Sequence, residues 1–118
     1  MTPPLSIEDI TARIRAFRDA RDWLQFHSPK DLTVAIIAEA GELLQPFVWK
    51  SPEDSWERAR AQRDAIAGEI ADVAILLFEL TDNLGLDLAA VMNAKLDRNE
   101  ERYPADKARG NNLKYNEL

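Results

Sequence analysis

Four acidic side chains interrupt the apolar stripes of two segments that are predicted to be helical. When each segment is wound at about 100° per residue, Glu39 falls inside one stripe and Glu42 lies one turn further on, at its edge. In a later segment Glu69 lies within the stripe, and Asp72 follows three residues on. Burying an isolated carboxylate is costly, and grouped carboxylates raise one another's pKa. A positive partner must therefore lie among these four side chains.

A divalent cation fits this pattern better than a basic side chain does, because neither acidic pair has a lysine or arginine at the needed spacing. Mg²⁺ prefers carboxylate oxygens combined with water and substrate phosphates. The alternative is that each pair lies on an exposed, charged helix face, which is common for such pairs taken singly. The joint pattern on two apolar faces favours a metal site.

A third segment offers side chains that complement a metal-bound phosphate. Lys95, Asn99 and Arg102 share the side of the helix that carries Leu88 and Val91. Two cations and an amide beside a metal are suited to a polyphosphate chain, and they indicate phosphoanhydride or phosphoryl chemistry. The alternative is that Lys95 and Arg102 run along the edge of the core and only their charged ends reach water.

The elements that position these residues are predicted to be helices, in an all-α fold. Hydrophobic periodicity and start signals predict four main helices, over residues 7–23, 29–45, 52–83 and 88–102, with a break in the third expected near Gly68. Ser6, Ser28, Ser51 and Asp87 are the expected N-caps. We expect a single domain, 1–118, with a helical core over about 6–103 and an extended or disordered polar tail, 104–118.

Composition excludes several classes of protein. The chain has 118 residues, of which 15 are basic and 21 acidic, for a net charge of −6, and this balance argues against a nucleic-acid binder. The absence of cysteine excludes disulfides and thiolate sites, and a single histidine, His27, argues against zinc and di-iron centres. No apolar run reaches the length of a membrane span and no signal peptide is recognisable, so we expect a cytoplasmic protein with no membrane partner.

Aromatic residues gather around the second predicted helix. Trp23 and His27 precede it, and Trp49 follows it. Aromatic side chains at helix ends commonly fill gaps in a core, but they can also stack on a nucleobase. The histidine is suited to a capping hydrogen bond or to a ligand contact.

Several stretches occur in the same order as in one enzyme family. They are Glu39-Ala40-Gly41-Glu42-Leu43-Leu44, Phe47-Val48-Trp49-Lys50 and Glu69-Ile70-Ala71-Asp72-Val73. The chain resembles the MazG-like, all-α nucleoside triphosphate pyrophosphohydrolases, whose paired acidic motifs these stretches match. Others are similar to the dCTP pyrophosphatase branch: Arg21–Pro29, Leu84–Leu88, Lys95–Asn99, Arg102–Pro104, and Arg109-Gly110 with Lys114-Tyr115.

The resemblance implies a four-helix MazG-like bundle and a reaction. The substrate would be a nucleoside triphosphate, dCTP or a related pyrimidine deoxynucleotide, hydrolysed to the monophosphate and pyrophosphate in nucleotide-pool house-cleaning. Glu39, Glu42, Glu69 and Asp72 would bind Mg²⁺, for which Mn²⁺ can substitute. Water would attack the α-phosphorus, with Glu39 or Glu42 as the catalytic residue that orients or deprotonates it.

The resemblance also implies the substrate contacts and the assembly. The residues that would hold the phosphates and sugar are Lys95, Asn99, Arg102, Arg109, Lys114 and Tyr115, and those on the base side are Trp23, His27 and Trp49. Relatives form dimers or dimer-of-dimers tetramers with sites partly built from a neighbouring chain, so a homo-oligomer is expected. Two other functions stay open: a non-catalytic helical oligomerisation or interaction module, and a phosphohydrolase that releases orthophosphate.

Overall fold

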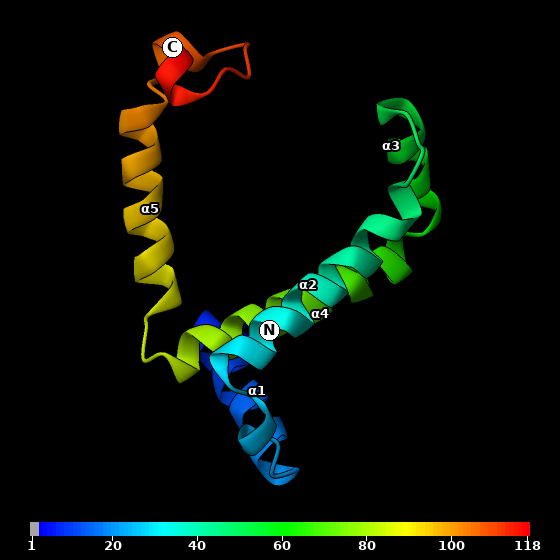
Figure 1. Ribbon diagram of the computed structural model, residues 1–118, viewed down its shortest axis with the longest axis vertical. Coiled ribbons are helices and arrows are strands. Elements are labelled where there is room, and N and C mark those ends of the chain that lie inside the picture. The colour runs from blue at the N-terminus through cyan, green and yellow to red at the C-terminus, as the bar shows by residue number, and fades with distance from the viewer. Residues whose placement is uncertain (1–2) are drawn as a thin grey trace. The chain divides into compact units, whose positions relative to one another are not determined.

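The computed structural model describes residues 3–118, and all of its regular elements are helices (Figure 1). No strand is present in this range, which confirms the predicted all-α class. The chain divides into two compact units, one ending at Gly85 and the other spanning Leu86–Leu118. The elements in chain order are α1 Ile7–Ala20, η1 Leu24–Phe26, α2 Pro29–Leu44, η2 Gln45–Phe47, α3 Pro52–Ala61, α4 Arg63–Asn83, α5 Leu88–Arg102, α6 Ala105–Ala108 and η3 Tyr115–Glu117.

Four helices begin where the sequence predicts, each at a side-chain cap. The hydroxyls of Ser6, Ser28 and Ser51 accept hydrogen bonds from the backbone N–H three residues on, and the carboxylate of Asp87 does the same for α5. At Ser6 the bond is reciprocated by Asp9, which completes a capping box. These bonds satisfy backbone donors that a helix start leaves unpaired.

The first unit is built around α2 and α4, which lie side by side (Figure 1). The helix α1 packs against α4, and α3 packs against α4 and η2. Each of the three larger helices supplies one buried apolar residue: Ile14 from α1, Leu32 from α2 and Ile66 from α4. Leu32 is the most enclosed, with 1% of its surface exposed. This pairing holds the facing sides of α2 and α4 in register.

The third predicted helix is two helices, and the break lies at Gln62 rather than at Gly68. Gln62 ends α3 by donating its backbone N–H to Arg58, and its carbonyl accepts from Ile66 at the start of α4. Gly68 lies inside α4, where a glycine costs only about 1 kcal/mol relative to alanine and does not force a break. The prediction of a break at Gly68 was therefore wrong.

The second unit contains α5 and a tail that is partly helical. The predicted range of α5 is confirmed. The tail was predicted to be extended or disordered, but it forms α6 and η3, which are single turns too short to produce a periodic pattern. The ring of Tyr115 lies 6.2 Å from that of Tyr103 in an edge-on arrangement, and this contact ties η3 to the end of α5. The single domain over 1–118 stays a prediction.

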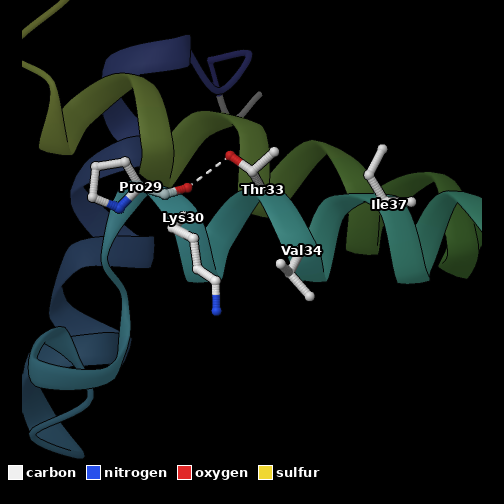
Figure 2. Close-up of a pocket in the computed structure, with 5 residues that line it drawn as sticks. All are labelled: Pro29, Lys30, Thr33, Val34 and Ile37. Carbon is white, nitrogen blue, oxygen red and sulfur yellow. Dashed lines mark hydrogen bonds between the residues drawn. The ribbon is translucent and has the colours of Figure 1, made fainter.

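One face of α2 is apolar and exposed. Val34, Ile37 and Leu44 leave 57%, 68% and 60% of their surface open. A shallow depression on this face is lined by Pro29, Lys30, Thr33, Val34 and Ile37 (Figure 2). The Thr33 hydroxyl donates a 2.7 Å hydrogen bond to the Pro29 carbonyl. Because both polar groups are paired with each other, mainly carbon atoms line the depression near the helix start.

Across the described residues, no single helix is long and apolar enough to cross a membrane. Pro29–Phe47 and Pro52–Ala61, bent by 104° at the break between them, meet the requirement only when taken together.

Candidate functional site

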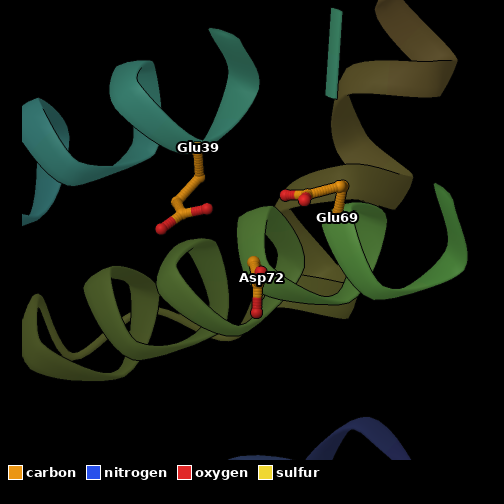
Figure 3. A group of neighbouring side chains, drawn as sticks. All are labelled: Glu39, Glu69 and Asp72. Carbon is orange, nitrogen blue, oxygen red and sulfur yellow. The ribbon is translucent and has the colours of Figure 1, made fainter. Parts of the chain in front are cut away.

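Three of the four predicted acidic residues meet between α2 and α4. Glu39 extends from α2 toward α4, where Glu69 and Asp72 lie one turn apart (Figure 3). One carboxylate oxygen from each lies within 4.8 Å of the other two. The i, i+3 spacing puts the two α4 residues on one side of the helix, and the α2–α4 pairing supplies the third. We call these three residues the acidic cluster.

Two carboxylate oxygens of the acidic cluster lack partners. Among the described residues, neither Oε2 of Glu39 nor Oε2 of Glu69 has a hydrogen-bond partner, although both atoms are buried. Desolvation raises the pKa of Glu39, and the charges of Glu42, Asp72 and Glu69 raise it further. The pKa of Glu69 is raised by desolvation and then by Glu42 and Asp72. Within the described residues of the first unit, no basic side chain therefore offsets these charges.

Glu42 lies at the edge of the acidic cluster. Its side chain is exposed and is not among the three that supply mutually close oxygens. Its charge nevertheless raises the pKa of both Glu39 and Glu69, so it lies near them. This position leaves its carboxylate accessible to water or to a ligand.

The acidic cluster fits a small, hard cation. Bonds of about 2.1 Å to an ion place opposite ligand oxygens about 4.2 Å apart, so only small side-chain movements would let all three carboxylates reach one ion. An all-oxygen donor set is the type that Mg²⁺, Mn²⁺ and Ca²⁺ use. The raised pKa values show the same shortage of positive charge that a bound cation would relieve.

The residues predicted for the base side are divided between the two ends of α2. Trp23 and His27 lie together before its start, with ring centroids 6.2 Å apart. Trp49 follows η2, beyond the other end of a 16-residue helix that is about 24 Å long. Trp49 is 98% exposed and has a φ of 62°, which is rare for a bulky residue. Within one chain these three residues are not brought together.

The residues predicted to hold phosphates and sugar all belong to the second unit. On α5, Lys95 is exposed, while Asn99 and Arg102 are half-buried. The guanidinium of Arg102 lies 4.8 Å above the ring of Tyr115. The structure therefore brings two of the predicted residues into contact. Arg109 and Lys114 flank the turns that lead to η3.

Sequence analysis missed a second polar cluster in the first unit. Glu79, on α4, is buried with 4% of its surface exposed and pairs with His27, and Arg18 of α1 is buried nearby. A signal was present, because Glu79 follows Asp72 by seven residues and so lies on the same side of α4. This third acid among apolar residues pointed to a partner elsewhere in the chain.

Comparisons with known proteins agree with this architecture. Residues 34–118 match the model of the MazG-like family. The human and rat proteins named dCTP pyrophosphatase 1 are each 37% identical over 119 aligned residues, which cover 99% of this chain and 70% of the relative. The crystal structure of a pyrophosphatase from Archaeoglobus fulgidus superposes with a TM-score of 0.81 at 34% identity, over 88% of this chain and 97% of that one. The chain belongs to the MazG-like family.

Proposed function

We propose that this protein hydrolyses a nucleoside triphosphate to the monophosphate and pyrophosphate, with Mg²⁺ held by the acidic cluster. The observation that carries the proposal is the convergence of Glu39, Glu69 and Asp72 with two buried carboxylate oxygens that lack partners. The names of the human and rat relatives support the reaction and its nucleotide substrate, and the Archaeoglobus protein is named a pyrophosphatase. Such a substrate is consistent with the cytoplasmic location expected from the sequence.

The side chains of the acidic cluster and Glu42 divide the chemistry between them. When bound, Mg²⁺ would neutralise phosphate charge and make a bound water more acidic; Mn²⁺ has the same oxygen preference. Glu39, Glu69 and Asp72 would hold the ion, and exposed Glu42 would orient a water and accept its proton. The water oxygen bonds to the α-phosphorus, the bond from that phosphorus to the bridging oxygen breaks, and pyrophosphate leaves.

The positive side chains of α5 and the tail are assigned to the negative end of the substrate. Lys95, Arg102, Arg109 and Lys114 are cations that match the charge of a triphosphate, and Asn99 and Tyr115 can hydrogen-bond to sugar or phosphate oxygens. Trp23, His27 and Trp49 are assigned to the base. The 37% identity to proteins named dCTP pyrophosphatase 1 favours a pyrimidine deoxynucleotide such as dCTP, which suits a role in clearing or balancing the nucleotide pool.

The test is a panel of common and modified nucleoside triphosphates, with and without Mg²⁺, in which pyrophosphate and orthophosphate are measured separately. We expect pyrophosphate and monophosphate in equal amounts, and only when the metal is present. In ¹⁸O-labelled water, the label should enter the monophosphate, because the attacked atom is the α-phosphorus. Repeating the panel with Mn²⁺ tests whether the site accepts another cation that prefers oxygen ligands or is specific for Mg²⁺.

Two results would contradict the proposal. Release of orthophosphate would place the protein in a different class of phosphohydrolases. Absence of any product would favour a non-catalytic helical interaction module. The variant Glu69→Gln serves as the site control, since it keeps the shape of the side chain and removes one charge. It should lose the activity that the unaltered protein shows.

We also propose that the working form is a homo-oligomer, a dimer or a dimer of dimers. The apolar face of α2, with Val34, Ile37 and Leu44 exposed, has the spacing of a helix-packing seam. Figure 2 shows Val34 and Ile37 on this face. If a second copy packed antiparallel on this face, the end of its α2 that leads to Trp49 would lie near Trp23 and His27 of the first copy. That arrangement would reunite base-side residues that lie at opposite ends of α2 in one chain.

The oligomer is tested by measuring mass in solution with light scattering or sedimentation. The unaltered protein should have the mass of two or four chains, and Ile37→Glu should shift it toward one chain while helical circular dichroism is kept. Arg58→Glu, a charge change on α3 rather than on α2, is the matched control. A single-chain mass for the unaltered protein would contradict the proposal.

A further inference from the structure

The buried carboxylate of Glu79 lies against the imidazole ring of His27. The Nδ1 atom of the ring lies 2.7 Å from Oε2 of Glu79 and 3.0 Å from Oε1. Only 4% of Glu79 is exposed, whereas 24% of the His27 side chain is. The carboxylate is therefore enclosed, and part of the imidazole side chain reaches the surface. His27 is the only histidine in the chain.

Further hydrogen bonds hold the segment around this ring against α4. Arg18, which is 5% exposed, donates a hydrogen bond of 2.7 Å to the side-chain oxygen of Asn83 and one of 2.9 Å to the carboxylate of Asp19. The side-chain amide of Asn83 in turn makes a long, 3.5 Å bond to the backbone carbonyl of His27. The ring and its own backbone are thus both attached to the last turns of α4. Such double attachment fixes the orientation of the imidazole.

An ionised carboxylate accepts hydrogen bonds and cannot donate them, so Nδ1 of His27 must carry the proton that they share. In the neutral ring, Nε2 then has a free lone pair and acts only as an acceptor. Among the described residues, no protein group bonds to Nε2. The ring of Trp23 lies alongside, with its centroid 6.2 Å away and 42% of the residue exposed. The pair presents an acceptor atom beside an aromatic surface.

We propose that Glu79 is a positioning residue that fixes the tautomer of His27, so that Nε2 accepts a hydrogen bond from the exocyclic amino group of a base packed on Trp23. A base with a carbonyl oxygen in place of that amino group would face the Nε2 lone pair with another lone pair and be rejected. This inference rests on the proposed function for its substrate. The tautomer itself is a property of the protein alone.

Because the chain has one histidine, imidazole ¹⁵N spectra at mildly alkaline pH report His27 without assignment. The unaltered protein should show a protonated Nδ1 and an unprotonated Nε2. Glu79→Leu should lose this pattern, and Glu79→Gln, whose amide can either donate or accept, should show a mixture. Asp82→Asn removes a carboxylate from the same end of α4 that pairs with Arg15 instead, and it should keep the pattern. A protonated Nε2 in the unaltered protein would overturn the role of Glu79.

The second measurement is the ratio of kcat/KM for dCTP to that for dUTP, whose bases carry an amino group and a carbonyl oxygen respectively at this position and differ also in the protonation of the adjacent ring nitrogen. Loss of one discriminating hydrogen bond should lower the ratio about tenfold in Glu79→Leu, with a smaller fall in Glu79→Gln and none in Asp82→Asn. Thermal melts confirm that each variant is folded. A changed tautomer with an unchanged ratio would overturn base selection. Hydrolysis of neither nucleotide would overturn base selection, and the full nucleotide panel then decides whether the proposed function fails as well. The spectra decide the role of Glu79 independently.

Discussion

The paired helices α2 and α4 carry polar residues at two places, and the two places differ in how their charges are balanced. In the last turns of α4, Glu79 pairs with His27, and Asp82 pairs with Arg15 through two hydrogen bonds of 2.6 and 3.0 Å. In the acidic cluster, carboxylates face one another, and two of their buried oxygens lack partners among the described residues. Glu79 and Asp82 thus each face a donor from another segment, although Oε2 of Glu79 accepts no hydrogen bond of good geometry from the described residues, whereas carboxylates that face only one another are expected to need a ligand to supply positive charge.

The largest expected effect comes from removing a carboxylate of the acidic cluster. Asp72→Asn or Glu39→Gln should lower pyrophosphate release at least about a hundredfold, because each removes a metal ligand. Thermal stability without metal should be unchanged or raised, since fewer like charges remain to repel one another. Steady-state assays and thermal melts measure the two effects. Full activity in either variant would show that the metal site is wrongly assigned.

Removing a partner of the last turns of α4 should have the opposite effect on stability and lower it. Arg18→Met removes the buried guanidinium that bonds to Asn83 and Asp19 and should lower the free energy of unfolding by about 2 kcal/mol. Arg13→Met, at an exposed position of the same helix, is the matched control and should change it by less than about 0.5 kcal/mol. Urea unfolding monitored by circular dichroism measures both. Equal effects would mean that the Arg18 bonds contribute little.

Stabilisation by Mg²⁺ should increase with pH. The pKa values of Glu39 and Glu69 are raised by desolvation and neighbouring charge, so the folded, metal-free protein holds these protons more tightly than the unfolded chain does. Their contribution to stability is present at low pH and is lost as the pH rises through the raised values. Mg²⁺ competes with these protons and should raise Tm more at neutral than at acidic pH.

Thermal melts with and without MgCl₂ over a series of pH values measure this dependence. The same series in Glu69→Gln should show a much smaller metal-dependent shift. A shift that is independent of pH in the unaltered protein would mean that the ion binds elsewhere.

The smallest effect is expected at the Arg15–Asp82 pair, whose side chains are 47% and 24% exposed. Asp82→Asn should lower the free energy of unfolding by about 0.5 kcal/mol. The hydrogen bond from Arg15 lowers the pKa of Asp82, so the contribution is present above the unfolded value and is lost as the pH falls through the folded one. A double-mutant cycle with Arg15→Met at neutral and acidic pH isolates the pair. A coupling that grows on acidification would contradict this sign.

Local signals predicted the helices well, and pairing across helices was harder to predict. The serine caps at positions 6, 28 and 51 need only the three residues that follow them, so helix starts could be derived from short stretches. The acidic cluster was predictable because both acidic pairs interrupt apolar stripes. The break at Gln62 was not, since it depends on where α3 must turn to pack against α4.

The pairing of Glu79 with His27 shows what a single sequence hides. These residues are 52 positions apart, and no local sequence pattern around either residue indicates that it contacts the other. Glu79 lies on the same side of α4 as Asp72, so periodicity alone would have assigned it to the acidic cluster. The structure separates the two roles by distance along the helix, because seven residues of helix span about 10 Å.

The sequence separation of the Arg15–Asp82 contact has a consequence for the order of folding. The pair joins residues 67 positions apart, whereas only η2 and α3 lie between α2 and α4 in the chain. Contacts that close shorter loops form at a lower cost in chain entropy. We therefore expect α2 and α4 to pair before α1 docks, so that Asp82→Asn speeds unfolding in stopped-flow experiments and leaves the folding rate nearly unchanged.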